Sequence, residues 1–299
     1  MLAIVIPYFK ISFFEAALIS LASQTDKRFN VYIGDDASPE NPSSLLEKYK
    51  GIVNFRYKRF DDNVGSSSLV GQWHRCLDLV QNEEWVMVLC DDDVLGENVV
   101  AEFYNAINEV DQQNINVIRY ATVVIDQHSE KISKIHEHPK LEKSTDFLMR
   151  KIKGGTRSSL SEFIFRKKVL LDIKFKELPL AWYSDYLAVL ECTYFGYIYT
   201  INNALVSFRL SEINITAKKD DLLPKNIATF HYYYYLLKEK GSFFDAGQTE
   251  TLLSRLEKTF LDNKKNIEFW WLLTKLYLSK MYFKKYFTFL GKISKSIKK

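Results

Sequence analysis

Cysteine, glycine and proline are all scarce in this sequence. Its 299 residues include 3 Cys, 11 Gly and 6 Pro. The low Gly and Pro content argues against long disordered segments. Cys76, Cys90 and Cys192 are odd in number, far apart and without metal-ligand spacing, which indicates reduced core thiols in a reducing compartment. The sequence therefore predicts a folded protein without disulfides.

Signals for secretion and for membrane crossing are also lacking. The first seven residues have no basic region followed by a long apolar stretch, and they are typical of a buried strand. Near the C-terminus, Lys275, Lys280 and Lys284 interrupt the apolar stretches before they reach the roughly 20 residues that a membrane span needs. These absences predict a cytoplasmic protein that does not cross a bilayer.

Charge is unevenly distributed along the chain. The residues from Lys264 to Lys299 include ten lysines and one acidic residue, Glu268, which gives this segment a formal charge of +9. Because the whole chain carries +4, the preceding 263 residues sum to −5. Aromatic side chains alternate with these lysines, which favours an amphipathic helix on an anionic membrane surface. A helix packed on the core explains the pattern equally well, whereas no nucleic-acid-binding motif accompanies the charge.

Apolar runs alternate with helical patterns in the first hundred residues. This alternation predicts an α/β protein with a mostly parallel, doubly wound sheet. In such sheets, ligands bind beyond the carboxyl ends of the strands. Strands are expected at 2–9, 29–34, 53–60 and 85–90, and helices at 13–23, 42–50 and 69–80.

The rest of the chain gives a less regular pattern. A polar stretch at 126–143 is typical of a surface loop or hairpin, and the pattern becomes helical and aromatic after about residue 222. Further elements are expected as a helix at 97–113, a strand at 116–125, an apolar segment at 163–171 and a helix at 185–195.

Carboxylates follow two of the expected strands. Asp91, Asp92 and Asp93 come directly after one of them, and like charges so close together raise each other's pKa. A hard divalent cation shared with substrate phosphates would compensate for this repulsion; a solvated turn or a helix start is the alternative. Asp35 and Asp36 end the other strand, where they either bind a nucleoside or form an ordinary Asp/Ser turn.

Four short motifs occur in order over roughly the first 100 residues. They are Ile4-Val5-Ile6-Pro7-Tyr8, Asp35-Asp36-Ala37-Ser38, Asp62-Asn63-Val64-Gly65 and Leu89-Cys90-Asp91-Asp92-Asp93-Val94-Leu95. Together they resemble the signature series of family 2 glycosyltransferases, and four motifs are more specific than one. The resemblance implies the GT-A fold, a Rossmann-like, mostly parallel central sheet flanked by helices, here with a helical C-terminal extension.

The resemblance also implies domain boundaries and roles for particular residues. Residues 1–220 would form the catalytic domain, with the nucleotide-binding half at about 1–100 and the acceptor half at about 101–220. Residues 221–299 would form the basic, helical extension. The donor would be a nucleoside-diphosphate sugar, most often a UDP-sugar in the family, with a guanosine or thymidine nucleotide as the alternative. Its binding residues would be Pro7, Tyr8, Asp35, Asp36, Asn63, Gly65 and Asp91, and Asp92 and Asp93 would bind Mn²⁺ or Mg²⁺.

Two neighbouring segments leave alternatives open. Many relatives have an acidic residue where Cys90 stands, so this chain depends more on the three aspartates that follow it. Trp73 lies on the apolar face of its expected helix, which favours a place in the core. His74 or Arg75 either faces the crevice or is solvated.

The resemblance places a general base in a short acidic motif, for which Trp182-Tyr183-Ser184-Asp185 is the best match. Asp185 would be the base, although a carboxylate at a helix start is the alternative. Relatives usually have Glu-Asp where this chain has Ser184-Asp185. The segment 208–216 resembles a late loop over the donor diphosphate, in which Arg209 would neutralise phosphate charge or be an ordinary exposed arginine. The histidine that usually follows this arginine is absent.

The function implied is that of an inverting glycosyltransferase. It would move a sugar to a hydroxyl of a glycan or lipid-linked oligosaccharide in cell-surface polysaccharide synthesis, as a cytoplasmic protein or on the inner face of the cytoplasmic membrane. The alternative is a catalytically silent nucleotide-sugar-binding or membrane-assembly scaffold of the same fold. A nucleotidyltransferase would need a Gly-rich phosphate loop, which residues 7–10 lack. The motifs indicate no particular oligomeric state.

Overall fold

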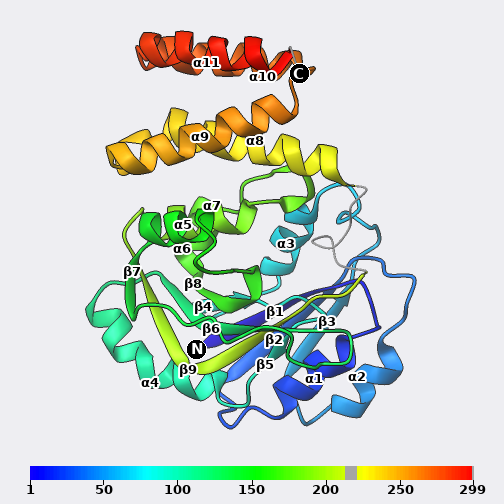
Figure 1. The fold of residues 1–299 in the computed structure, drawn as a ribbon. Helices are drawn as coiled ribbons and strands as arrows, with labels where there is room; N and C mark the ends of the chain where they lie inside the picture. Colours follow the sequence, from blue (N-terminus) through cyan, green and yellow to red (C-terminus); the bar gives the residue numbers. More distant parts are fainter. Residues whose placement is uncertain (213–220, 298–299) are drawn as a thin grey trace. The chain divides into compact units, whose positions relative to one another are not determined.

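The computed structural model describes residues 1–212 and 221–297 (Figure 1). The chain divides into two compact units. One comprises Met1–Glu177 with Ser184–Lys218 and contains the sheet. The other comprises Leu178–Tyr183 with Lys219–Lys299 and is helical.

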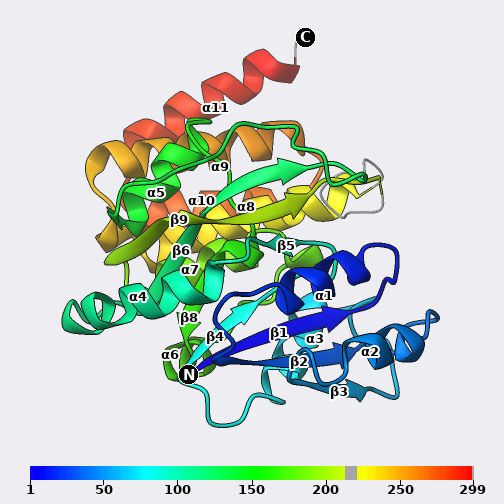
Figure 2. The same ribbon diagram turned by 90° about the horizontal axis from the view of Figure 1, so that it is seen from below.

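A single mixed sheet forms the centre of the first unit (Figure 2). Its strand order is β3-β2-β1-β4-β8-β6-β9-β5, and β7 pairs with β9. The first four strands are mutually parallel, β8 is antiparallel to both of its neighbours, and β6 and β9 are parallel. The expected mostly parallel α/β fold is thus confirmed. The strands are β1 Leu2–Tyr8, β2 Phe29–Asp35, β3 Phe55–Arg59, β4 Trp85–Val88, β5 Val94–Leu95, β6 Val117–Ile125, β7 Leu141–Lys143, β8 Phe163–Arg166 and β9 Tyr197–Arg209.

Helices cover both faces of the sheet, which explains why β1 is an almost continuous apolar run. Leu2, Ile4 and Ile6 of β1 join one hydrophobic cluster with side chains of α1, α2 and α4. The helix α3 lies on the opposite face, as Figure 1 shows. The helices of this unit are α1 Phe14–Ala22, α2 Ser43–Tyr49, α3 Leu69–Leu77, α4 Val99–Gln112, α5 Ser144–Ile152, α6 Lys167–Ile173, α7 Ser184–Cys192 and the 3₁₀ turn η1 Leu160–Glu162.

The helix α3 packs closely on the end of β2. Its N-cap is Ser68, whose hydroxyl accepts a hydrogen bond from the Gly71 N–H at 2.8 Å. A Cβ atom at Gly34 would lie 2.3 Å from the Cys76 sulfur, so only glycine allows this approach. Trp73 is buried, which confirms its expected place in the core. All three cysteines are free thiols, as expected.

The second half of the sheet differs most from the expectation. The sequence pattern does not predict β9, yet this 13-residue strand pairs with β6, β5 and β7. The polar stretch at 126–143 folds back on β6 as a hairpin-like segment, with isolated antiparallel bridges at Thr122–His136 and Ile125–Lys131. Nine strands therefore contribute to the sheet in the described residues.

The second unit is built from aromatic helices and confirms the helical C-terminal extension. Phe230 stacks on Phe269 with ring centroids 3.8 Å apart, and the Tyr277 hydroxyl donates to Glu257 at 2.5 Å. Within the described residues, none of the helices combines the length and the apolarity needed to cross a membrane. The elements are η2 Pro179–Ala181, α8 Leu222–Glu239, η3 Gly241–Phe243, α9 Ala246–Asp262, α10 Ile267–Ser279 and α11 Phe283–Ile297.

Candidate active site

Asp91 ties together the carboxyl ends of β1 and β4. Its Oδ2 accepts hydrogen bonds from the main-chain N–H groups of Phe9 at 2.8 Å and Lys10 at 2.9 Å. Burial, followed by the negative charge of Asp92, raises the pKa of the Asp91 carboxyl to about 7. The two main-chain donors oppose this rise because they stabilise the ionised form.

Asp93 lies deeper in the protein and joins β4 to the end of β9. It is 1% exposed, and its Oδ1 accepts a hydrogen bond from the main-chain N–H of Arg209 at 2.8 Å. Its Oδ2 is buried and has no hydrogen-bond partner within the described part of the chain. Burial and the charge of Asp92 raise the pKa of the Asp93 carboxyl to about 8. This carboxylate is therefore costly to ionise unless a cation is near it.

Cys90, Asp92 and Asp93 form a group that could hold a metal ion. Their potential ligand atoms all lie within 4.8 Å of one another. The two carboxylates suit a hard divalent cation, and the unpartnered Oδ2 of Asp93 is an available ligand atom. Without a cation, burial and the neighbouring carboxylates raise the pKa of the Cys90 thiol well above its ordinary value. The two carboxylates fit Mn²⁺ or Mg²⁺, because these hard cations prefer oxygen ligands to the softer sulfur of Cys90.

Arg209 belongs to β9, so the expected placement of Phe208 and Arg209 in a late loop is wrong. The long-range pairing of β9 with β6 extends the strand up to this arginine. Its side chain is buried, where Nε donates to the Asp92 carbonyl at 2.9 Å and Nη1 to the Asp126 carbonyl at 2.8 Å. The guanidinium therefore braces the main chain of the acidic cluster. Residues 214–216 of the expected loop lie outside the described residues.

Asp35, at the end of β2, is fully buried, and its carboxylate accepts hydrogen bonds from three neighbouring residues. Its Oδ1 accepts the Ser38 N–H at 2.8 Å. Its Oδ2 accepts the Tyr57 hydroxyl at 2.5 Å and Arg59 Nη1 at 3.0 Å. These bonds fix the turn after β2, from which Asp36 projects.

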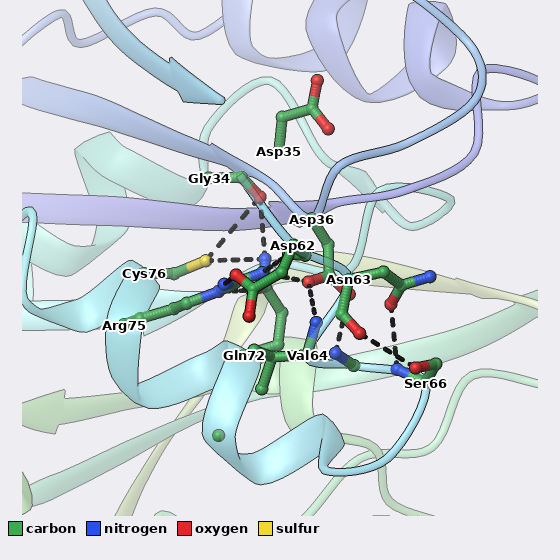
Figure 3. A network of polar contacts seen from close by, with 12 residues as sticks. Gly34, Asp35, Asp36, Asp62, Asn63, Val64, Ser66, Gln72, Arg75 and Cys76 are labelled. Carbon is green, nitrogen blue, oxygen red and sulfur yellow. Dashed lines mark hydrogen bonds and ion pairs between the residues drawn. The ribbon is translucent and has the colours of Figure 1, made fainter. Parts of the chain in front are cut away.

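Asp36 holds the loop that contains the third motif, as Figure 3 shows. Its carboxylate oxygens accept the main-chain N–H groups of Val64 at 2.9 Å and Gly65 at 2.8 Å. Arg75 of α3 forms an ion pair with Asp36 and a second one with Asp62 at 2.8 Å. Burial raises the pKa of the Asp36 carboxyl, whereas the two N–H donors and Arg75 oppose this rise. The Arg75 side chain therefore faces this loop and is not a fully solvated helix residue.

Three other residues expected at the nucleoside pocket, Pro7, Tyr8 and Asn63, differ in their exposure and in their hydrogen-bond partners. Pro7 is partly exposed within β1. Tyr8 is buried, and its hydroxyl donates to the Glu40 carbonyl at 2.7 Å. Asn63 is exposed, and its Oδ1 accepts the Ser66 N–H at 2.9 Å. Tyr8 and Asn63 thus each fix a nearby segment of the main chain, at Glu40 and at Ser66.

Gly65→Ala is expected to disrupt this loop, because a Cβ atom there would lie 2.3 Å from Asp36 Oδ2. We expect a loss of about 1–3 kcal/mol in the free energy of unfolding, measured by urea denaturation. Gly291→Ala is the matched control, since no atom lies within 4 Å of the added Cβ. Wild-type stability of Gly65→Ala would contradict the close approach of Gly65 to Asp36.

Asp185 lies in the first turn of α7, as expected for a helix-start carboxylate. Burial raises the pKa of its carboxyl to about 7, and the charge of Glu162 adds to this rise. The Tyr186 N–H and Lys151 act in the opposite direction. A carboxylate with a pKa near neutrality is suited to accept and release a proton at physiological pH.

The turn η1 carries two site residues that the sequence analysis missed. The Ser161 hydroxyl accepts a hydrogen bond from the Cys90 N–H at 3.0 Å, and Glu162 acts electrostatically on Asp185. Glu162 is buried within a capping box, in which its carboxylate accepts the Ser159 N–H at 2.9 Å. The spacing Ser-x-x-Glu is the sequence signal for this arrangement. One turn thus contacts the acidic cluster and tunes the candidate base.

Comparisons with known proteins identify the family of this chain. The sequence model of the family described as Glycosyl transferase family 2 matches residues 3–172, which is more than half of the chain. The chain therefore belongs to glycosyl transferase family 2 and is a glycosyltransferase. A search of curated protein sequences found no match.

Solved structures of S. aureus TarS share the fold. The crystal structure of TarS 1–349 in complex with UDP-GlcNAc has a TM-score of 0.66 at 16% identity, covering 87% of this chain and 72% of that one. TarS 1–349 without a named ligand gives a TM-score of 0.61 at 15% identity over the same shares. A further TarS structure gives 0.61 at 16% identity, covering 87% of this chain and 43% of that one. Identities this low show a shared fold.

Proposed function

We propose that this protein is an inverting glycosyltransferase that takes a sugar from a nucleoside-diphosphate donor, with UDP as the expected nucleotide. The observation that carries the proposal is the carboxylate cluster Asp91–Asp93, in which Asp93 is buried, at the ends of β4, β1 and β9. The TarS complex with UDP-GlcNAc supports the same donor class, because the two proteins share a fold.

The donor side of the proposed site uses the carboxyl ends of β1, β2 and β4. Asp36 and Arg75, through the loop at Val64 and Gly65, would shape the nucleoside pocket. Asp91 would meet the ribose. The remaining donor residues in the proposal are Pro7, Tyr8, Asp35, Asn63 and Arg209.

Asp92 and Asp93 are the residues that would hold Mn²⁺ or Mg²⁺. When bound, such a cation would stabilise the negative charge of the departing diphosphate. Arg209 keeps these carboxylates in place through its bonds to the main chain of Asp92 and to the Asp93 carboxylate. We propose that this bracing, together with partial charge neutralisation, is its role.

Asp185 is the proposed general base. The acceptor hydroxyl would transfer its proton to Asp185 as its oxygen forms a bond to the anomeric carbon. The bond from that carbon to the diphosphate oxygen would break on the opposite side, and the diphosphate would leave with the electron pair. A single displacement of this kind inverts the anomeric centre and needs no covalent enzyme intermediate.

The proposed acceptor is a glycan or a lipid-linked oligosaccharide in cell-surface polysaccharide synthesis, and the proposed location is the cytoplasm. The basic, aromatic C-terminal segment supports a lipid-linked acceptor, because such a segment suits the surface on which that acceptor is carried. Cys90 and Ser184 depart from the usual family residues, and these two departures favour the second candidate, a catalytically silent scaffold.

Thermal unfolding with a panel of nucleoside diphosphates, with and without Mn²⁺, tests the donor site. We expect one nucleotide to raise the Tm only when Mn²⁺ is present, since a ligand at about 100 times its Kd stabilises the folded state by about 2.7 kcal/mol. Mn²⁺ alone is the control. Absence of a shift with every nucleotide would count against the donor site, whereas binding without release of nucleoside diphosphate would favour the silent scaffold.

A further inference from the structure

The last two helices expose an unusual number of large apolar side chains. Trp271 is 61% exposed and Phe287 is 70% exposed. Ile267, Leu278, Met281 and Phe283 are also exposed. We call these six side chains the outer apolar face. Exposed apolar groups that cluster on one segment mark an interaction site more often than scattered ones do.

Helical geometry arranges these side chains in two rows. Ile267, Trp271 and Leu278 follow one another at intervals of four and seven residues, which places them on one side of α10. Phe283 and Phe287 are four residues apart on α11. Met281 lies in the turn that joins the two helices.

The opposite side of the same helices already packs within the helical unit. Phe269, Leu273, Leu276 and Tyr277 of α10 are buried there, as is Phe289 of α11. Packing on the protein core and binding to a membrane surface, the two explanations of the C-terminal pattern, are therefore compatible. One side of the helix pair holds the unit together, and the outer apolar face is left for another partner.

Positive charge accompanies the outer apolar face. Lys275 lies 4.8 Å from the centroid of the Trp271 ring, and Lys284 is exposed beside Phe283 in sequence. Neither lysine has a carboxylate partner within the described residues. Two other lysines of α11 do form ion pairs: Lys285 pairs with Glu250, and Lys292 Nζ lies 2.7 Å from a carboxylate oxygen of Glu257. The segment as a whole contains ten lysines and one acidic residue.

We propose that the outer apolar face docks on an anionic lipid surface. Exposed Trp and Phe side chains can insert at the boundary between headgroups and acyl chains, while the flanking lysines neutralise lipid phosphates. A second copy of this chain fits less well, because a symmetric contact would bring together two segments that each carry +9. The proposal does not depend on glycosyl transfer.

Co-sedimentation of the full chain with lipid vesicles tests the proposal. Vesicles of phosphatidylcholine alone are compared with vesicles in which half of the lipid is phosphatidylglycerol. We expect the protein to sediment with the anionic vesicles and to remain in solution with the neutral ones. Added salt should weaken the binding, because it screens the attraction between lysines and lipid headgroups.

Two double variants separate the apolar and the electrostatic contributions. Trp271→Ala with Phe287→Ala should lower vesicle partitioning by roughly tenfold or more, because two large apolar side chains no longer insert. Lys275→Gln with Lys284→Gln should lower it by about fivefold for each lysine. Tyr197→Ala is the matched control, since it removes an exposed aromatic ring from the other unit. Unchanged Tm values establish that the variants fold.

Equal binding to neutral and anionic vesicles, or no binding to either, would overturn the proposal. Wild-type binding by the Trp271→Ala and Phe287→Ala variant would also overturn it. Light scattering provides the remaining comparison. Self-association that this variant abolishes, without vesicle binding by the wild type, would assign the outer apolar face to a second copy of the chain.

Discussion

Asp92→Ala is expected to abolish transfer that depends on a divalent cation, lowering kcat by about three orders of magnitude. Asp92 belongs to the group whose ligand atoms lie within 4.8 Å of one another. Asp91 and Asp93 each already accept main-chain hydrogen bonds, which orient them but also occupy part of their carboxylates. Removal of Asp92 should therefore leave too few ligands to hold the cation. Release of nucleoside diphosphate with and without Mn²⁺ measures the loss.

The same substitution should have a second effect that distinguishes it from simple unfolding. Asp91 and Asp93 have folded-state pKa values of about 7 and about 8, above the ordinary value of 3.8. Carboxyls with raised pKa values cost stability as the pH rises from the unfolded pKa to the folded pKa. Because the charge of Asp92 contributes to both shifts, Asp92→Ala should be more stable than the wild type at pH 8 without cation.

Asp172→Ala is the matched control for this substitution, because it removes an exposed aspartate of α6 in the same unit. It should retain wild-type transfer and wild-type stabilisation by Mn²⁺. Cation-stimulated release of nucleoside diphosphate by Asp92→Ala at the wild-type rate would mean that the cation is held elsewhere. Loss of activity with a lowered Tm at every pH would instead indicate misfolding.

The first half of the fold was predictable because its signals are local. β1, β2 and β4 are short apolar runs buried on both faces. One of the four motifs includes the last residue of β1, another includes the last residue of β2, and a third directly follows β4. Such runs need no knowledge of distant partners. The position of the carboxylates at the strand ends then follows from the parallel arrangement of these strands.

The second half was less predictable because its signals depend on distant contacts. Asn202 and Asn203 interrupt the apolar pattern of β9, and a register shift in the pairing of β6 with β9 accompanies them. The strand exists because it pairs with β6, which is remote in sequence. Arg209 was therefore expected in a loop, although it is a buried strand residue.

Electrostatic tuning was also beyond the sequence pattern. Helical periodicity places Arg75 on the surface of α3, but it cannot show that its guanidinium bridges Asp36 and Asp62. The pKa of Asp185 depends on burial and on Glu162, which is 23 residues away in sequence. Of these features, only the capping box of Ser159 and Glu162 could be predicted from its spacing in the sequence.

Asp185→Asn is expected to lower the rate of transfer by about 10²–10⁴-fold, the usual contribution of a general base. The amide keeps the size and shape of the side chain but cannot accept a proton. Donor binding should be nearly unchanged, because Asp185 is proposed to act on the acceptor. Nucleotide-dependent shifts in Tm measure donor binding, and single-turnover transfer measures the chemical step.

The pH profile provides a test of the base that a purely structural role would not satisfy. Burial raises the pKa of the Asp185 carboxyl to about 7, so its ionised fraction grows as the pH rises through neutrality. We expect kcat/KM to rise with pH over this range and to level off above it. Lys151→Gln should move the rise to higher pH, because the positive charge of Lys151 lowers the pKa of Asp185.

Stability should respond to Asp185 in the opposite direction to activity. The ionised carboxylate is disfavoured by burial, so the wild type should lose stability as the pH rises from about 4 to about 7. Asp185→Asn removes that loss and should have a higher Tm than the wild type at pH 8. A more stable protein that has lost transfer but retains donor binding would identify Asp185 as a catalytic base. Transfer at the wild-type rate by this variant would mean that another group accepts the proton of the acceptor hydroxyl.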